Sequence, residues 1–239
     1  MANYVCGDLH GYIEIFKKIK SMLQPDDVVY FIGDAGDRGP QSWECIKAIY
    51  EDPQFIYLKG NHEDMLVKAC EKYIKDEFMW DYKTYSLCCY NGGTLTLLDW
   101  EKDPDRELWL ERLKNLPTWD IVECNEMCFV LSHAGFTPWV LEDTNECVIP
   151  DDYDLLWNRN HYFDDWNENE MNNSIIIIHG HTPILHLAND INFNRELTSG
   201  AFWYDKNHKV CIDSGGFFTG EWILLNLNTL ESIIVSLDK

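Results

Sequence analysis

The sequence has no long apolar stretch and no recognisable export signal. None of its apolar runs approaches the roughly 20 consecutive residues that a transmembrane helix needs, so we expect no membrane partner. The first residues pass straight into a polar, glycine-bearing segment, without the basic region and long apolar core of a signal peptide. We therefore expect a cytoplasmic protein.

Basic residues are also scarce. Lysine and arginine number 19 against 41 aspartates and glutamates, which gives a formal net charge of −22. Proteins that bind nucleic-acid polymers neutralise backbone phosphates with Lys and Arg, so this balance argues against a polynucleotide partner. An acidic protein that holds metal cations at one place still suits a small phosphate substrate, although solubility is the simpler explanation of the charge.

The nine cysteines lack the spacing of a zinc knuckle or a redox motif, because no C-x-x-C pair occurs. Their number is odd, and no secretory signal accompanies them. This pattern is typical of reduced thiols, most of them buried as small apolar side chains.

The chain contains no low-complexity linker and no repeat array, and we expect a single domain over residues 1–239. Apolar strands alternate with helix-like segments in the first third, and strands return in the second half. The predicted strands are residues 4–6, 28–32, 55–58, 127–131, 175–178, 210–212, 222–227 and 233–237. This alternation predicts an α/β fold with buried sheet.

Residues 73–117 break this pattern. The segment is rich in Trp and Tyr, and it is predicted to be mostly helical with an interruption at residues 91–93. We interpret it as a cap inserted within the domain. Its aromatic residues are expected to form the cap's own core, and Trp80 and Tyr85 are the positions to test for nucleotide stacking.

Polar residues with a glycine beside them follow the ends of the predicted strands. A lone Asp or His in a loop is more often a capping or surface group, but here the placement recurs strand after strand. Ligand sites of open α/β sheets gather at the carboxyl ends of strands, so the recurrence predicts a metal site. The candidate ligands are Asp8, His10, Asp34, Asn61, His62, His133 and His181.

These ligand types are carboxylate, imidazole and amide, without a thiolate. They suit two divalent ions, with manganese as the first choice and iron, zinc or magnesium as alternatives. Two such ions can share a bridging water, which attacks phosphorus in line without a side-chain base. A leaving-group acid and a phosphate clamp are still needed. His62 paired with Asp37 can be the acid, and Arg38 and Arg159 can bind phosphate oxygens.

Five segments taken together resemble a known family. GDLHG at residues 7–11, GDAGDRG at 33–39 and GNHE at 60–63 resemble the signature motifs of the phosphoprotein phosphatases, which belong to the calcineurin-like metallophosphoesterases. HAG at 133–135 and GHTP at 180–183 resemble the two later histidine motifs. The resemblance covers nearly the whole chain and is greatest for the bacterial and phage, lambda-phosphatase-like branch. Residues 91–93, 157–159 and 212–215 also resemble segments of that branch.

The resemblance implies a fold of two mixed β-sheets flanked by helices, with two metal ions at one edge. Asp8 and His10 would hold the first ion, Asp34 would bridge both, and Asn61, His133 and His181 would hold the second. His62 would be the general acid, paired with Asp37. The substrate phosphate would be bound by Arg38, Arg159 and Asn61. The implied activity is that of a phosphomonoesterase, a serine/threonine or dual-specificity protein phosphatase, acting on a phosphorylated protein or a small phosphoester.

Three alternatives stay open. Symmetrical dinucleoside tetraphosphatases resemble this family closely, but they often have a small residue in place of Asp37 and an Asp in place of Glu63. A phosphodiesterase or nuclease would usually carry Gly-His-x-His, whereas Thr182 and Pro183 follow His181 here. A non-catalytic metal-binding scaffold would be expected to have lost His62, Asp37 or a bridging ligand, and all are present. The oligomeric state is left open.

Some features of the sequence differ from the motifs of this family or lie outside them. Gly36 stands where relatives usually have a larger apolar residue, which questions the rigidity of the loop around Asp34. The long eukaryotic C-terminal signature is absent, so regulatory subunits of the eukaryotic type are not expected. We predict that His179 is structural, and that three further histidines lie at the surface, namely His161, His186 and His208.

Overall fold

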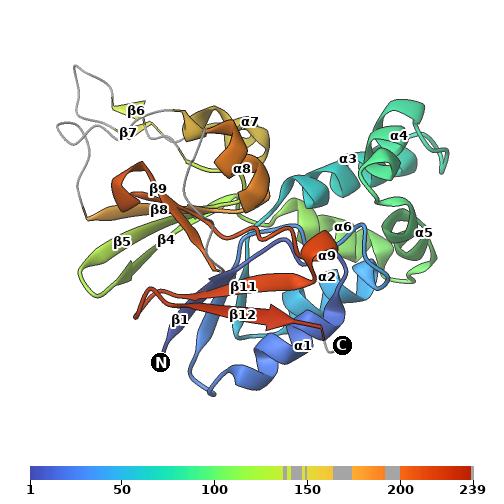
Figure 1. Cartoon of the computed structure of the whole chain (residues 1–239). Helices are drawn as coiled ribbons and strands as arrows, with labels where there is room; N and C mark the ends of the chain where they lie inside the picture. The colour runs from blue at the N-terminus through green and yellow to red at the C-terminus, as the bar shows by residue number, and fades with distance from the viewer. Residues whose placement is uncertain (137–138, 141–146, 149, 164–173, 192–199, 238–239) are drawn as a thin grey trace.

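Two five-stranded mixed sheets lie face to face, with helices on the outside (Figure 1). The computed structural model describes residues 1–136, 139–140, 147–148, 150–163, 174–191 and 200–237. The first sheet has the order β12-β11-β1-β2-β3. Its strands are β1 (Asn3–Cys6), β2 (Val28–Phe31), β3 (Phe55–Tyr57), β11 (Glu221–Asn226) and β12 (Ser232–Ser236), of which β1, β2 and β3 run parallel.

The second sheet has the order β4-β5-β8-β10-β9, with β5, β8 and β10 parallel at its centre. Its strands are β4 (Trp119–Cys124), β5 (Met127–Ser132), β8 (Ile175–His179), β9 (Phe202–Tyr204) and β10 (Lys209–Cys211). A small hairpin pairs β6 (Trp139–Val140) with β7 (Cys147–Val148). The expected α/β fold of two mixed sheets flanked by helices is confirmed.

The central strands are apolar on both faces because both faces are buried. In β8, Ile176 and Ile178 pack between the sheets, where they join Val5 of β1 and Leu225 of β11. Ile177 points the other way and packs with residues of β5 and α7 (Asp152–Trp157). A strand covered on both sides needs no polar alternation, which explains the continuous apolar runs in the sequence.

Helices α1 (Ile13–Met22), α2 (Ser42–Glu51) and α3 (Asn61–Lys75) cover the outer face of the first sheet. Ile15 and Ile19 of α1 and Ile46 of α2 pack there with Phe31 of β2. Each of these helices follows a parallel strand, so the loops between strand and helix are brought to one edge of the sheet. Helices α8 (Ile184–Asp190) and α9 (Gly216–Thr219) follow β8 and β10.

Helices α4 (Tyr82–Tyr90), α5 (Thr94–Lys102) and α6 (Arg106–Lys114) extend beside α3 (Figure 1). Their aromatic residues pack on one another: Trp80 stacks on Tyr73 with ring centres 4.2 Å apart and contacts Tyr85, while Trp100 is fully buried. These contacts match the expected aromatic core. The interpretation of residues 73–117 as an inserted cap stays a prediction.

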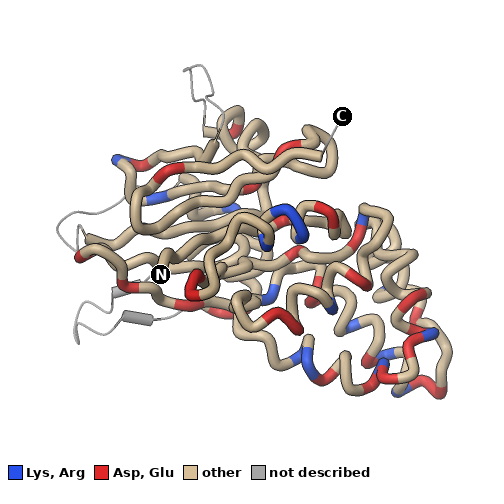
Figure 2. Tube along the Cα trace, turned by 90° about the horizontal axis from the view of Figure 1, so that it is seen from below, with Lys and Arg blue, Asp and Glu red and all other residues tan. Residues whose placement is uncertain are grey.

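Charge is distributed over the molecule without one basic face. Figure 2 shows Asp and Glu positions spread along the described trace, with Lys and Arg positions interspersed among them and no continuous basic stripe. None of the helices in the described ranges is long and apolar enough to cross a membrane. The cysteines whose side chains are described are free, and most are buried, as predicted.

Candidate metal centre

The loops after β1 and β2 are joined by backbone hydrogen bonds. The N–H of Asp8 donates to the carbonyl of Gly33 at 3.0 Å, and the N–H of His10 donates to the carbonyl of Asp34 at 3.0 Å. In the second sheet, the N–H of Gly180 donates to the carbonyl of His133 at 2.9 Å. The N–H of His181 donates to Asp8 Oδ1 at 3.2 Å, so loops from both sheets meet at one edge of the sandwich, where the predicted ligands lie.

Asp34 lies at the middle of this cluster. Its Oδ1 is 3.4 Å from His133 Nε2, and its Oδ2 is 3.8 Å from His10 Nε2 and 3.7 Å from His62 Nε2. Ligand atoms fall into two groups, each within 4.8 Å: one has His10, Asp34 and His62, and the other has Asp8, Asp34 and His133. Asp34 belongs to both groups, as a bridging ligand would. The groups do not reproduce the predicted pairing of Asp8 with His10, which stays a prediction.

Asn61, His133 and His181 contact one another directly, as expected for three ligands of one ion. Asn61 Oδ1 lies 2.8 Å from His133 Nε2 and 3.0 Å from His181 Nδ1. The other ring nitrogen of His133 is 2.9 Å from the carbonyl of Ile32, a contact that fixes the orientation of the ring. Asn61 is the first residue of α3, so the helix start places its amide in the cluster.

Two buried atoms of this cluster have no hydrogen-bond partner in the described structure: Asp8 Oδ2 and His181 Nε2. Buried polar atoms are nearly always paired, and both of these are metal-ligating types. Gly180 packs so closely that an added Cβ would lie 2.1 Å from Asp8 Oδ2. The unpaired atoms, the close approach and the oxygen and nitrogen ligands fit a pair of divalent ions.

The electrostatics of the cluster also favour cations. Burial raises the pKa of the Asp8 carboxyl well above its usual range, and the neighbouring Asp213 raises it further. Burial likewise raises the pKa of Asp213 to about 6. For Asp34, burial would raise the pKa, but His133 and His62 outweigh it and hold the pKa well below its usual range. Positive charge placed here would favour ionised carboxylates.

Six of the ten predicted site residues have a left-handed backbone with φ between 48° and 66°. Such conformations cost non-glycine residues about 1–2 kcal/mol each, so packing around the loops must hold them. Their concentration at the predicted ligands is a mark of a functional site. The six are Asp8, His10, Asp34, Asp37, Arg38 and His181.

His62 and Asp37 form a buried pair beside the ligand groups, as predicted. His62 Nδ1 lies 2.7 Å from Asp37 Oδ2, and both side chains are almost fully buried. Burial lowers the pKa of His62, but the carboxylates of Asp34 and Asp37 outweigh that effect and raise it overall. A protonated ring in this position can donate from Nε2 towards the ligand groups.

Arg38 is an exposed residue, but its guanidinium reaches the cluster. Nη1 lies 2.7 Å from His10 Nε2, and Nη2 lies 3.0 Å from His62 Nε2. The ring of Phe217 faces the same group, with its centre 4.5 Å from Cζ. The predicted phosphate-binding arginine therefore lies over the centre and is backed by an aromatic ring.

Arg159 approaches from the second sheet. Its Nε donates to Thr182 Oγ1 at 2.8 Å, and Tyr162 donates to the same hydroxyl. Thr182 directly follows His181 in the sequence, so this hydrogen bond holds Arg159 beside a predicted ligand. Burial, His133 and the charge of Arg159 together lower the pKa of His181. Both predicted arginines thus border the predicted ligands.

The sequence did not reveal the role of Glu63. Its carboxylate accepts hydrogen bonds from the backbone N–H groups of Asp34, Ala35 and Gly60 and from the hydroxyl of Tyr57, at 2.8–2.9 Å. It therefore supports the loop behind the site. In the sequence analysis, Glu63 served only to distinguish this chain from symmetrical dinucleoside tetraphosphatases. Its contacts are with the protein's own backbone and Tyr57, so they give no direct physical reason for a substrate preference.

The structure also shows the surroundings of Gly36 and of two further histidines. Gly36 packs against Ile46, and its carbonyl lies 3.0 Å from His10 Nδ1, so this loop position orients a predicted ligand. His179 is structural, as predicted, with Nε2 2.8 Å from the Tyr204 hydroxyl. The prediction that His161 lies at the surface is wrong: it is buried, because Gly135 leaves room for its ring.

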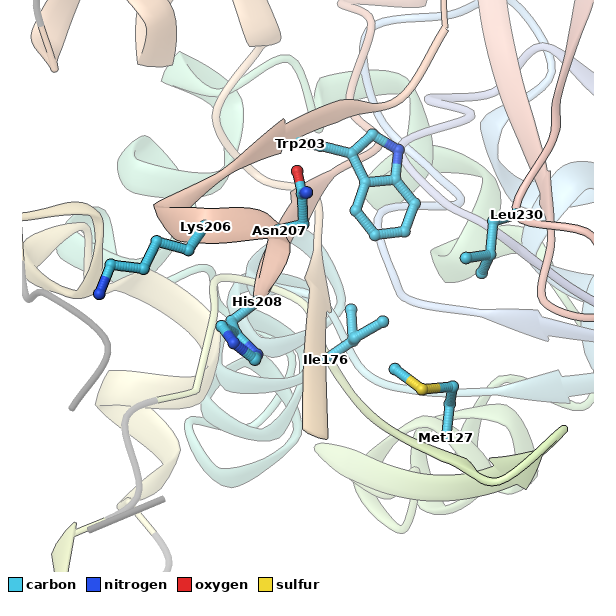
Figure 3. A pocket seen from close by; sticks show the side chains of 7 residues that line it. All are labelled: Met127, Ile176, Trp203, Lys206, Asn207, His208 and Leu230. Atoms are coloured by element: carbon cyan, nitrogen blue, oxygen red, sulfur yellow. The ribbon is translucent and has the colours of Figure 1, made fainter. Parts of the chain in front are cut away.

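A separate pocket of about 550 Å³ lies away from these residues (Figure 3). None of the predicted site residues lines it. Its lining comes from β5, β8, β9 and nearby turns: Met127, Ile176, Trp203, Lys206, Asn207, His208 and Leu230. The candidate site is therefore the ligand cluster at the sheet edge and not this pocket.

Known proteins resemble the chain in both sequence and fold. The catalytic subunit A1 of serine/threonine-protein phosphatase 2B from Saccharomyces cerevisiae is 34% identical over 104 residues, which cover 39% of this chain and 18% of that protein. The asymmetrical bis(5'-nucleosyl)-tetraphosphatase of Anoxybacillus flavithermus is 23% identical and covers 97% of this chain and 92% of its own length. The chain thus spans about a fifth of the yeast relative and most of the bacterial one.

The crystal structure of a cold-active protein-tyrosine phosphatase from a psychrophilic Shewanella species superposes with a TM-score of 0.56 at 17% identity. The match covers 98% of this chain and 77% of that one and supports the two-sheet fold. The family model of the calcineurin-like phosphoesterases matches residues 3–212. That span contains every predicted ligand, and the chain belongs to the calcineurin-like phosphoesterase family.

Proposed function

We propose that the protein is a metal-dependent phosphomonoesterase that acts as a serine/threonine, or dual-specificity, protein phosphatase. The observation that carries this proposal is the buried pair of His62 and Asp37, with a contact of 2.7 Å, beside two ligand groups that share Asp34. A non-catalytic scaffold would have no need of a buried pair of histidine and aspartate at this position.

In this proposal, Asp8, His10, Asp34, Asn61, His133 and His181 hold two divalent ions, with manganese as the first choice. When bound, the ions supply an activated water and neutralise charge on the phosphate. His62 gives its Nε2 proton to the ester oxygen as the bond from phosphorus to that oxygen breaks. Asp37 stabilises the protonated ring and keeps Nε2 directed at the substrate.

Arg38 and Arg159 bind the non-bridging phosphate oxygens, with Asn61 beside them. Arg38 now contacts ring nitrogens of His10 and His62, and its exposed position lets it exchange these contacts for phosphate oxygens. Arg159 is held through Nε, which leaves its two terminal nitrogens for a bidentate contact. A phosphoester of a protein side chain or a small molecule satisfies this clamp.

A dinucleoside tetraphosphatase is the second candidate, because a bacterial relative named as one matches 97% of this chain. Asp37 argues only against the symmetrical kind of tetraphosphatase, which often has a small residue at this position. The stacking of Trp80 on Tyr73 favours the phosphomonoesterase, because this ring is engaged within the helical segment.

The test compares a phosphothreonine peptide with diadenosine tetraphosphate, using metal-stripped protein with manganese added back. Faster phosphate release from the peptide is expected. Two molecules of adenosine diphosphate, with little peptide turnover, would instead identify a symmetrical tetraphosphatase. Release of ATP with AMP would identify an asymmetrical one, and no turnover of either substrate would contradict both candidates.

A further inference from the structure

Asp37 has a second buried partner that comes from a distant part of the chain. The Thr96 hydroxyl donates to Asp37 Oδ1 at 2.6 Å, while Asp37 Oδ2 faces His62 Nδ1 at 2.7 Å. Thr96 is fully buried in helix α5, 59 residues away in sequence. Both carboxylate oxygens are therefore engaged, one by the proposed acid and one by this hydroxyl.

The turn before α5 packs against the loop that carries Asp37 and Arg38. The carbonyl of Gly92 accepts a hydrogen bond from the N–H of Arg38 at 3.1 Å. An added Cβ on Gly93 would lie 2.4 Å from Cys88 Sγ and 3.0 Å from Asp37 Oδ1, so only glycine fits there. The turn at residues 91–93, an unexplained part of the sequence pattern, thus holds α5 against the loop that carries Asp37 and Arg38.

We propose that Thr96 is a positioning residue, which holds Asp37 in the orientation that keeps the His62 ring directed at the leaving group. The inference rests on the proposed acid role of His62. Because Thr96 contacts Asp37 only on the side away from His62, its hydroxyl fixes the rotation of the carboxylate without entering the site.

Removing the hydroxyl would leave a buried carboxylate oxygen without a donor. The carboxylate would then rotate towards another donor, and this rotation weakens its contact with His62. Helices α4–α6 would in this way set the efficiency of the acid while contributing no residue to the metal ligands. A residue that only fills space in α5 would have no such effect.

The test uses Thr96→Val, which keeps the shape but removes the hydroxyl, and Thr96→Ser, which keeps the hydroxyl. Thr94→Val is the matched control, because Thr94 is exposed two residues earlier on the same helix. Rates are measured with p-nitrophenyl phosphate, whose leaving group departs without a proton, and with an alkyl phosphate, whose leaving group needs one.

We expect T96V to lower kcat on the alkyl phosphate by about 10-fold or more. This loss should not exceed the loss caused by H62N, which removes the acid itself. KM should change little, p-nitrophenyl phosphate should be affected much less, and T96S should restore most of the rate. T94V should match the wild type on both substrates. Equal losses on both substrates, or a failure of T96S to restore the rate, would overturn the proposal.

A double variant separates this inference from the proposed function. If Thr96 acts through His62, T96V combined with H62N should be no slower on the alkyl phosphate than H62N alone. A further multiplicative loss would mean that Thr96 acts by another route. If H62N itself shows no dependence on the leaving group, the proposed acid is wrong. If H62N shows the expected loss on the alkyl phosphate while T96V is unaffected, only the role of Thr96 is overturned. Metal content and thermal midpoint of each variant show that the loss does not arise from unfolding.

Discussion

His62 lies between two carboxylates, with Nδ1 2.7 Å from Asp37 and Nε2 3.7 Å from Asp34. Replacing it by Asn removes the proton donor and keeps a side chain of similar polarity. We expect H62N to lower turnover of a phosphothreonine peptide by roughly 10²–10⁴-fold while metal content is unchanged. Steady-state rates and elemental analysis measure the two quantities.

The matched control for that variant is H186N, since His186 is exposed on α8. It should keep wild-type turnover. Unchanged turnover in H62N would remove this residue from the reaction, and a loss of metal would instead make it a ligand.

Asp34 is shared by both ligand groups, so its loss should affect both ions. In Asp34→Asn the amide keeps one oxygen but loses the negative charge that offsets the cations. We expect metal occupancy and activity to fall together, as measured by elemental analysis of protein loaded under equal conditions. Asp26→Asn, at an exposed position, should retain full occupancy. Two fully occupied sites in D34N would contradict the bridging role.

At the scale of secondary structure, Glu63 joins the start of α3 to the loops after β2 and β3. Each carboxylate oxygen accepts two hydrogen bonds. In Glu63→Gln the amide nitrogen would face two of these donors, which would be left buried without an acceptor. Such losses cost about 1–3 kcal/mol each, so we expect the free energy of unfolding to fall by about 2–6 kcal/mol.

Urea unfolding followed by circular dichroism measures this change. Glu71→Gln is a suitable control on the same helix, because Glu71 makes a solvent-exposed ion pair with Lys114. Exposed pairs contribute little, so the control should change stability much less. Equal effects of the two substitutions would show that the buried contacts of Glu63 do not support the loops.

The strands at the centre of each sheet were predictable because burial on both faces gives continuous apolar runs. Strands β4 and β9, at the edges of the second sheet, were missed, although β3 and β12 at the edges of the first sheet were predicted. Strand β4 carries Asp120 and Glu123, and its Ile121 is half exposed, so it lacks the apolar signal. A strand with this polar pattern is defined by its pairing with a partner strand, which the local sequence does not encode.

In the site, too, some residues could be predicted from the sequence and others could not. Spacing and motifs indicated the ligands because each of them follows the end of a strand. The roles of Thr96 and Glu63 depend on contacts between distant segments, and a buried Thr is ordinary in any helix. His161 was misplaced because its burial depends on the space left by Gly135, which is 26 residues away. Supporting residues are therefore harder to predict than ligands.

For the molecule as a whole, the charge of −22 and the buried acids share one consequence. Asp213 and Asp34 lie close enough to Asp8 to raise its pKa, and Asp34 also raises the pKa of Asp213. Like charges in this arrangement oppose folding unless cations offset them. Ions that bind only the folded protein should therefore contribute to its stability as well as to catalysis.

We expect removal of metal by a chelator to lower the thermal midpoint, and manganese to restore it. A free ion concentration 100 times the dissociation constant stabilises the folded state by about 2.7 kcal/mol, which corresponds to about 5–10 °C for a chain of this size. Sodium chloride at matched ionic strength controls for general screening of the acidic surface, which should give a smaller shift. D34N should lose most of the manganese effect and D26N should keep it. If manganese and sodium chloride shift the midpoint equally in all three proteins, the stabilisation arises from the overall charge and not from a metal site at the sheet edge.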